Sequence, residues 1–496
     1  MTETLRAKAI SGAKWRVVAT YSEQLIQAVG AFALFWLLDK DDYGLMAAAM
    51  VVVSLIRGCT SLGMNYAIVQ RRDRVQEAVD TGFVLLLVMA VVSCAVLAVA
   101  APFSGAYKAD RGLVWALGLL FFFRPLAIVT EGALYRDFHF RRLFVVDFSS
   151  IALSTGLAIG LAAALPKGQR YWALAVSGLA REALRSAAGW VLSPLRPKLR
   201  FDWAMAKELL RYNKYLWAAS VVMVLYSNVE RLAIVEVLSV GALGLYHFAS
   251  TWVTSVGIIS ETIFGSVAIS VYARLQDDVP RLRTSFVRIV RLSALLSTGL
   301  LTGLVILVPE AVALAFPARW LPAVPILEAL GLFYIVRAID TTTGQLYVAA
   351  GRPELNMHLG IVNLVVMALT IVPCVLWKEV VGAALCLLVA RLVTMACNAF
   401  VLRRVLRCSI WRLVPVVTPA LKGALVMALV LIAGLLGAYR VWGGVGWLAL
   451  VGLIVLGAAS YAAAIFLLER ELFREVVGLL RDALRGERSR PDGLAS

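Results

Sequence analysis

The stretch LGLLFFFR, over Leu117–Arg124, recurs later in the chain as LGLFYIVR over Leu330–Arg337. Each copy places one arginine inside a long apolar run. A second matching pair of intramembrane arginines is formed by Arg181 and Arg391. An arginine at membrane depth costs about 2.5–3.5 kcal/mol on insertion scales, so it usually faces a polar cavity or a charged partner. The recurrence therefore predicts two related halves with arginines at matching positions.

The composition of the chain is that of a membrane protein. Apolar residues make up 61% of the 496 residues and charged residues only 16%, which lies outside the range of soluble proteins. A bilayer core about 30 Å thick needs about 20 apolar residues per helix. This rule predicts an all-α polytopic membrane protein with fourteen spans, at 13–38, 43–66, 78–101, 112–134, 145–165, 171–192, 212–237, 243–268, 288–308, 321–350, 357–377, 380–402, 416–439 and 443–468.

The net charge of +17 is distributed very unequally between the two predicted sides of the membrane. Lys and Arg gather in alternate loops, such as 71–74, 196–214, 274–291 and 403–407, and in the tail after residue 470. Loops rich in Lys and Arg stay in the cytoplasm. The pattern predicts that both termini are cytoplasmic, and it accounts for the positive charge without a nucleic-acid partner.

Shorter matches extend the duplication along the chain. Gly44-Leu45 and Ala49 recur two hundred positions later as Gly244-Leu245 and Ala249. Six spans per half is an even number, so both halves begin on the same side and the repeat is parallel, about an axis along the membrane normal. Parallel repeats place a substrate site at their interface. The predicted domains are a six-helix lobe at 1–205, a second at 206–408, and an appended pair of spans with a cytoplasmic amphipathic tail at 409–496.

Two segments have the pattern of helices that lie on the membrane surface. One is Asp202–Arg211, predicted to turn Trp203, Met205, Leu209 and Leu210 toward the bilayer. The other is the tail, where apolar residues recur at helical spacing over 472–484. Anchoring to the membrane is the favoured interpretation of both segments, with docking of a partner protein as the alternative.

Two pairs of glycines stand four residues apart inside predicted spans. They are Gly156–Gly160 and Gly299–Gly303. This GxxxG spacing allows close approach of helices in membranes. We expect both pairs to lie at helix–helix contacts. The three histidines and six cysteines form no ligand cluster and no CxxC motif, so neither a metal site nor a cofactor is expected.

Five arginines are the predicted substrate-binding residues. A guanidinium stays charged when poorly solvated and binds phosphate oxygens through two parallel hydrogen bonds. The sequence thus predicts a cationic cavity for an anionic substrate, with no catalytic residues. The alternative for each arginine is a structural ion pair, most plainly for Arg181 beside Glu182. The predicted cavity residues are Arg57, Arg124, Arg181, Arg337 and Arg391.

Intramembrane carboxylates are the candidates for coupling transport to an H⁺ or Na⁺ gradient. Asp340 is the first choice, because Thr341, Thr342 and Thr343 follow it and supply further oxygen atoms within one turn. The alternative is that these carboxylates neutralise the arginines, since Asp340 is one turn from Arg337. The candidate carboxylates are Asp340, Glu23, Glu131 and Glu261, with Glu328 as a further intramembrane acid.

The first sixty residues resemble the start of bacterial polysaccharide exporters of the Wzx/WzxC type. Members of that family show a tryptophan in the first helix and a leucine–acidic–tyrosine–glycine–leucine turn into the second. Gly12, Trp15 and the run Asp42-Tyr43-Gly44-Leu45 match this pattern. Spans grouped as six, six and two also resemble this superfamily, which contains the lipid II flippase MurJ and the multidrug MATE exporters.

The resemblance implies a flippase of the bacterial cytoplasmic (inner) membrane. Its substrate would be an undecaprenyl-diphosphate-linked oligosaccharide, moved outward by alternating access for exopolysaccharide, capsule or O-antigen synthesis. The implied partners are membrane lipids, the polysaccharide polymerase and the export machinery. The resemblance assigns no coupling residue, so Asp340 rests on the sequence pattern alone.

Two alternatives come from other functional classes. A MATE-like exporter of soluble cationic compounds is disfavoured because cationic lining residues would repel its substrate. A membrane-embedded enzyme that modifies polysaccharides needs a large outer loop or a catalytic histidine with partners. His247 is the histidine well inside a predicted span, and it has no acid one turn away. We therefore expect a transporter rather than an enzyme.

Overall fold

A computed structural model describes most of the chain, and the part it describes is helical with no strand. The described residues are 21–60, 73–103, 110–136, 139–276, 278–340, 342–405 and 414–469, with Met64 and Ile68. The predicted first span is described from residue 21, where residues 21–37 are helical. Gly12 and Trp15 lie outside the described residues, as does the predicted amphipathic tail at 472–484.

Within the described residues, eight helical stretches are long and apolar enough to cross a membrane. A ninth counts if Val240–Gly257 and Glu261–Arg274, bent by 47°, form one span. The chain is therefore an all-helical, multi-pass membrane protein, as its composition predicts. The number fourteen and the parallel repeat stay predictions. The eight are Val75–Ala100, Arg111–Arg136, Phe140–Ala164, Val279–Ala315, Ala318–Ala349, Glu354–Val405, Val414–Trp442 and Trp447–Leu468.

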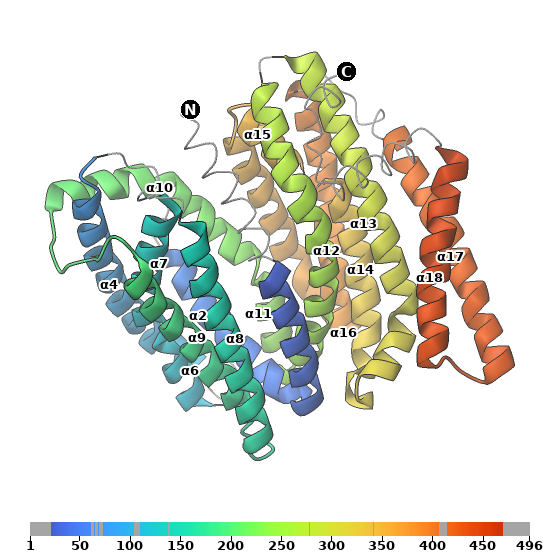
Figure 1. Cartoon of the computed structure of the whole chain (residues 1–496), viewed down its shortest axis with the longest axis horizontal. Helices are drawn as coiled ribbons and strands as arrows, with labels where there is room; N and C mark the ends of the chain where they lie inside the picture. The colour runs from blue at the N-terminus through green and yellow to red at the C-terminus, as the bar shows by residue number, and fades with distance from the viewer. Residues whose placement is uncertain are drawn as a thin grey trace. The chain divides into compact units, whose positions relative to one another are not determined.

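The chain divides into two compact units, Met1–His247 and Phe248–Ser496. In the first unit, α8 and α9 pack side by side, α9 packs on α7, and α7 packs on α4 (Figure 1). Helices α4 and α10 both pack on α2. The described elements of this unit are α2 (Lys40–Thr60), α4 (Val75–Ala100), η1 (Ala101–Phe103), α6 (Arg111–Gly118), α7 (Leu120–Arg136), α8 (Phe140–Ala164), α9 (Tyr171–Leu192), α10 (Trp203–Tyr226) and α11 (Val229–Val237).

The predicted surface helix at Asp202–Arg211 is wrong in its extent and partly in its orientation. Asp202 caps α10, its side chain accepting hydrogen bonds from the backbone N–H groups of Ala204 and Met205. The helix then continues without interruption to Tyr226. Met205 and Leu209 are buried in a cluster with α4 and α7 residues, whereas Trp203 is 62% exposed. The apolar residues do recur at helical spacing, but two of them pack inside the unit and do not face the bilayer.

The second unit is organised around α13, which packs against α14, α17 and α18. Its 37 residues make a helix about 55 Å long, longer than a bilayer core. Helix α16 has 52 residues and breaks at Lys378 and Glu379, where Glu379 has a φ of 49°. Its two arms correspond to the predicted spans 357–377 and 380–402. The elements are α12 (Val240–Arg274), which begins in the first unit, α13 (Val279–Ala315), η2 (Ala318–Ala323), α14 (Val324–Ile339), α15 (Thr343–Ala349), α16 (Glu354–Val405), α17 (Val414–Trp442) and α18 (Trp447–Leu468).

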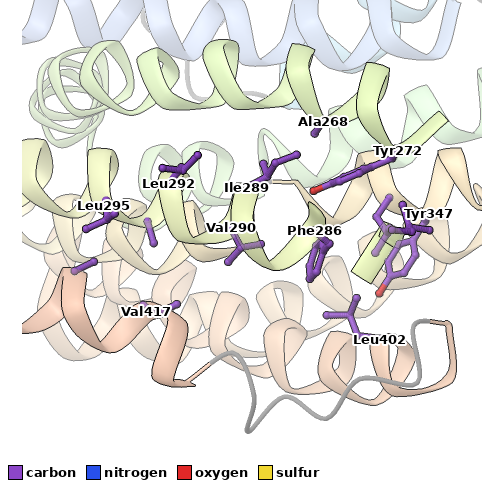
Figure 2. Packing of buried hydrophobic residues seen from close by; sticks show 14 of the residues in the cluster. Ala268, Tyr272, Phe286, Ile289, Val290, Leu292, Leu295, Tyr347, Leu402 and Val417 are labelled. Atoms are coloured by element: carbon purple, nitrogen blue, oxygen red, sulfur yellow. The ribbon is translucent and has the colours of Figure 1, made fainter. Parts of the chain in front are cut away.

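The main core of the second unit joins α12, α13, α15, α16 and the last two helices. Figure 2 shows Tyr272 of α12, Phe286 and Val290 of α13, and Tyr347 of α15 packed together. Tyr272 and Tyr347 are fully buried. Burial of side chains this large contributes substantially to holding the helices together, because aromatic residues bury about 150–250 Å² each.

The two GxxxG pairs behave differently. Gly299 and Gly303 of α13 lie against Tyr461 of α18 and Met427 of α17, so close that a methyl group would approach within 2.8 and 2.7 Å of them. Here the predicted close packing is confirmed. Gly156 and Gly160 of α8 have nothing within 4 Å of such a methyl group. The prediction is wrong for this pair, because α8 meets its neighbour through another face.

Candidate functional site

The first unit holds a cluster of charged side chains inside its helices. Arg124 of α7 donates to Glu182 of α9, with 3.1 Å between Arg124 Nη1 and Glu182 Oε1. Ser186, one turn after Glu182, donates to the backbone carbonyl of Phe123 at 2.6 Å. These contacts hold α7 and α9 together beside the ion pair. Arg57 of α2 lies close enough to Arg124 and Glu182 to interact with both electrostatically.

A second ion-pair group extends the first-unit cluster. Arg185 of α9 lies 2.6 Å from Glu131 of α7 through Nε, and 3.0 Å from Asp147 of α8 through Nη2. Both carboxylates are largely buried, with 9% and 11% of their side chains exposed. One guanidinium therefore bridges two helices. Glu131, a candidate coupling residue, is committed to an ion pair in this state.

In the first-unit cluster, two of the three carboxylates pair with the same arginine. We define the first-unit charge cluster as Arg57, Arg124, Arg185, Glu131, Asp147 and Glu182. Arg181 is half-buried on α9, directly before Glu182. Within the described part of the chain, Arg57 has no carboxylate in ion-pair contact. A buried guanidinium without a counter-charge is costly.

In the second unit, Arg337 of α14 pairs with Glu261 of α12. Arg337 Nε lies 2.7 Å from Glu261 Oε1, and Nη2 donates to Oε2 at 3.2 Å. This two-point geometry is the stronger form of an arginine–carboxylate pair. The guanidinium also lies 5.3 Å from the ring of Tyr334, whose hydroxyl is 2.9 Å from that of Thr254. The pair therefore ties α14 to α12 close to the bend of α12.

A buried polar network surrounds Asp340, at the break between α14 and α15. Its Oδ1 accepts hydrogen bonds from Thr343 at 2.6 Å and from Asn398 at 2.5 Å. Its Oδ2 lies 3.2 Å from Arg391 Nη2, and only 9% of the Asp340 side chain is exposed. Tyr347 donates to the amide oxygen of Asn398. Both carboxylate oxygens are thus engaged by protein groups.

The structure brings the predicted residues together in pairs rather than as one set of cations. Glu261 pairs with Arg337. Asp340 pairs with Arg391, although Arg337 is nearer to it in the sequence. Glu23 is half-buried in the helical residues 21–37. The roles of these residues in substrate binding and ion coupling stay predictions. The alternative, that carboxylates neutralise the arginines, describes the contacts of Arg124, Arg337 and Arg391 in this structure.

Several members of the site escaped the sequence reasoning. Asp147, in the predicted fifth span, and Arg185, one turn after Arg181, both carry an intramembrane charge that should have selected them. Asn398 carries no such signal. An amide is tolerated in a membrane helix for many reasons, and only its contact with Asp340 and Tyr347 shows its place in the network.

Comparison with protein families places the chain. A family profile described as "Polysaccharide biosynthesis protein" matches residues 34–325, more than half of the sequence. The chain belongs to this family. The match covers the first-unit charge cluster and the α12 carboxylate Glu261. Arg337, Asp340 and Arg391 lie beyond the matched residues.

Curated members of this polysaccharide biosynthesis group are similar over most of the chain. The lipopolysaccharide biosynthesis protein WzxC of Escherichia coli K12 is 23% identical over 72% of this chain and 73% of its own length. The teichuronic acid biosynthesis protein TuaB of Bacillus subtilis 168 is 25% identical over 70% and 73%. The succinoglycan biosynthesis transport protein ExoT of Rhizobium meliloti 1021 is 22% identical over the full length of both chains.

Solved structures agree on the fold of this family member. The lipid II flippase MurJ in an inward closed conformation superposes with a TM-score of 0.72 at 12% identity, covering 92% of this chain and 99% of MurJ. An inward-facing multidrug MATE transporter superposes with a TM-score of 0.62 at 14% identity, covering 78% and 96%. The chain therefore has the fold shared by MurJ and MATE transporters.

Proposed function

We propose that this protein is a flippase for a polyprenyl-diphosphate-linked oligosaccharide. Its fold is that of MurJ, and its family acts in polysaccharide biosynthesis. The observation that carries the proposal is the first-unit charge cluster, where Arg57 lies beside the paired Arg124 and Glu182 and makes no ion-pair contact with a described carboxylate. A diphosphate would give Arg57 a negatively charged partner. Transport of this kind breaks no covalent bond, so no catalytic residue is proposed.

The proposed arrangement is fourteen spans in two parallel lobes plus an appended pair, with both termini in the cytoplasm of the producing bacterium. The substrate would enter from the inner leaflet and bind through Arg57, Arg124 and Arg337. Closure on the inner side and opening on the outer side would then release it. Arg181 and Arg391 are proposed as further substrate-binding cations.

The ion pairs give this cycle a physical basis. A diphosphate competes with Glu182 for Arg124 and with Glu261 for Arg337, so binding would exchange internal pairs for pairs with the substrate. Coupling to H⁺ or Na⁺ is proposed at Asp340, where a cation would compete with Arg391 for the carboxylate. Such an exchange costs less than exposing either charge alone in the membrane.

Proteoliposomes with a fluorescent undecaprenyl-diphosphate oligosaccharide test this function. The measurement is the rate at which the label becomes accessible to a membrane-impermeant quencher. We expect faster leaflet exchange than in protein-free vesicles and its loss in the triple variant Arg57→Gln, Arg124→Gln, Arg337→Gln. Arg337→Lys should retain part of the activity, because the charge remains while the two-point geometry is lost.

Two controls sharpen the test. Arg281→Gln removes an arginine that is 66% exposed at the start of α13, and should leave the rate unchanged. A fluorescent soluble cation in the same vesicles examines the MATE-like alternative. Transport of the cation without exchange of the lipid-linked saccharide, under imposed potential and ion gradients, would replace this proposal with the soluble-compound exporter.

A further inference from the structure

Helix α16 carries an apolar groove between the ends of its two arms. The groove has a cavity volume of about 530 Å³. Because α16 turns back at Lys378 and Glu379, its first and last turns lie at the same end. Lining residues recur on one face of each arm, among them Leu355, Leu359 and Val362 on the first and Ala396, Phe400 and Val401 on the second.

The groove is open rather than filled by neighbouring side chains. Phe400 is 58% exposed, and His358 and Ala396 are exposed as well. Its floor is firm, because Leu359 and Val401 pack against the core cluster shown in part in Figure 2. A rigid floor with exposed apolar walls suits a flexible hydrocarbon chain, because the chain can contact both walls at once.

Positive charge lies at the mouth of the groove. Arg403 and Arg404 are exposed in the last turn of α16, and Arg404 lies 4.5 Å from the Phe400 ring that forms a wall. Arg352 is exposed just before the first arm, with Glu354 as the acidic residue beside it. These four side chains sum to a net charge of +2. By the positive-inside pattern this end is cytoplasmic.

We propose that this groove is a binding site for an anionic phospholipid of the inner leaflet, distinct from the transport site. One acyl chain occupies the groove, and the phosphate binds Arg403 and Arg404. The lining of each arm covers about two helical turns, about 10 Å, which matches part of an acyl chain and is far shorter than a long polyprenyl chain. Anionic headgroups and clustered arginines attract one another at this membrane surface.

Photo-crosslinking tests the site without any transport measurement. The full chain is reconstituted in phosphatidylcholine vesicles with a trace of phosphatidylglycerol that carries a diazirine in its acyl chain, and crosslinked peptides are mapped. We expect labelling within 355–362 and 396–401, about tenfold above that by the matching diazirine phosphatidylcholine. Arg403→Gln with Arg404→Gln should reduce labelling to the phosphatidylcholine level.

Matched variants separate the two parts of the site. Ala396→Trp fills the groove and should abolish labelling there, while Leu392→Trp, one turn earlier and outside the lining, should not. Arg440→Gln removes an exposed arginine at the end of α17, away from the groove, and should leave labelling unchanged. Equal labelling by both phospholipids would overturn the proposal. Stronger labelling by a diazirine polyprenyl phosphate would also overturn it, in favour of a substrate-chain site.

Discussion

Gly44 and Gly244 lie against each other's helices in a reciprocal contact. A methyl group on Gly44 would overlap the backbone carbonyl of Val240, and one on Gly244 would overlap the backbone carbonyl of Lys40. All four residues belong to the first turns of α2 and α12, within the first compact unit. The two glycines are also partners in the predicted sequence repeat. The backbones of α2 and α12 therefore meet at a point that admits no side chain.

Substitution at this contact should destabilise the protein. The obstructing atoms are backbone carbonyls, which cannot rotate away as a side chain can. Gly44→Ala and Gly244→Ala should each lower the free energy of unfolding by about 1–3 kcal/mol through overpacking. Gly156→Ala adds the same methyl group where nothing lies within 4 Å, and should be neutral or stabilising by up to about 1 kcal/mol. Thermal unfolding in detergent compares the three; equal melting temperatures would contradict the contact.

The Asp340–Arg391 pair should show strong coupling in a double-mutant cycle. Asp340→Asn leaves Arg391 buried without its counter-charge, and Arg391→Gln leaves the carboxylate. We expect each single change to cost about 3–5 kcal/mol of stability, and the double variant to cost much less than their sum. Chemical unfolding in detergent gives the four free energies.

The exposed pair Asp278–Arg281 provides the reference for that cycle. Its side chains are 45% and 66% exposed, so its coupling should be within about 0–1 kcal/mol. A coupling for Asp340 and Arg391 as small as this reference would show that the buried pair is not maintained in the membrane protein.

Neutralising Glu182 should strengthen binding of the proposed substrate. Glu182→Gln frees Arg124 from its ion pair and raises the local positive charge beside Arg57. Affinity for an undecaprenyl diphosphate should rise about fivefold, equivalent to about 1 kcal/mol, while turnover falls because release is slower. Equilibrium binding and the vesicle assay report the two effects. The control Glu77→Gln, at an exposed pair with Arg74, should change neither the affinity nor the turnover. A weaker affinity in Glu182→Gln would instead show that Glu182 organises the site and does not compete with the substrate for Arg124.

Asp202 should make the start of α10 sensitive to acid. Hydrogen bonds from the backbone N–H of Met205, with those of Ala204 and the side chain of Arg74, hold the pKa of Asp202 below its ordinary value. A lowered pKa in the folded state contributes stability above the unfolded value near pH 4, which is lost as the pH falls through the folded value. Amide exchange at Ala204 and Met205 should therefore accelerate below about pH 4. Asp202→Asn can still cap the helix but does not titrate, so its exchange should lack this acid step.

The fold class was predictable because its cause is local. Apolar runs of about 20 residues must become helices in a bilayer, since every backbone polar group needs a partner within the segment. The points where helices bend or continue were harder to predict from the sequence. Two arms of α16 were predicted as two spans, but the continuation of Asp202–Arg211 into α10 was missed. Apolar spacing does not distinguish a face toward lipid from one toward another helix.

The sequence by itself determined that this chain is a helical membrane protein with arginines and carboxylates inside its apolar runs, because both features depend on residue type along the chain alone. Only the tertiary structure decided which charges neutralise one another. Arg391 pairs with Asp340, and Arg124 with Glu182, across helices far apart in the chain. Pairing depends on distances of a few ångströms between side chains on different helices, and helix packing, not sequence spacing, sets those distances.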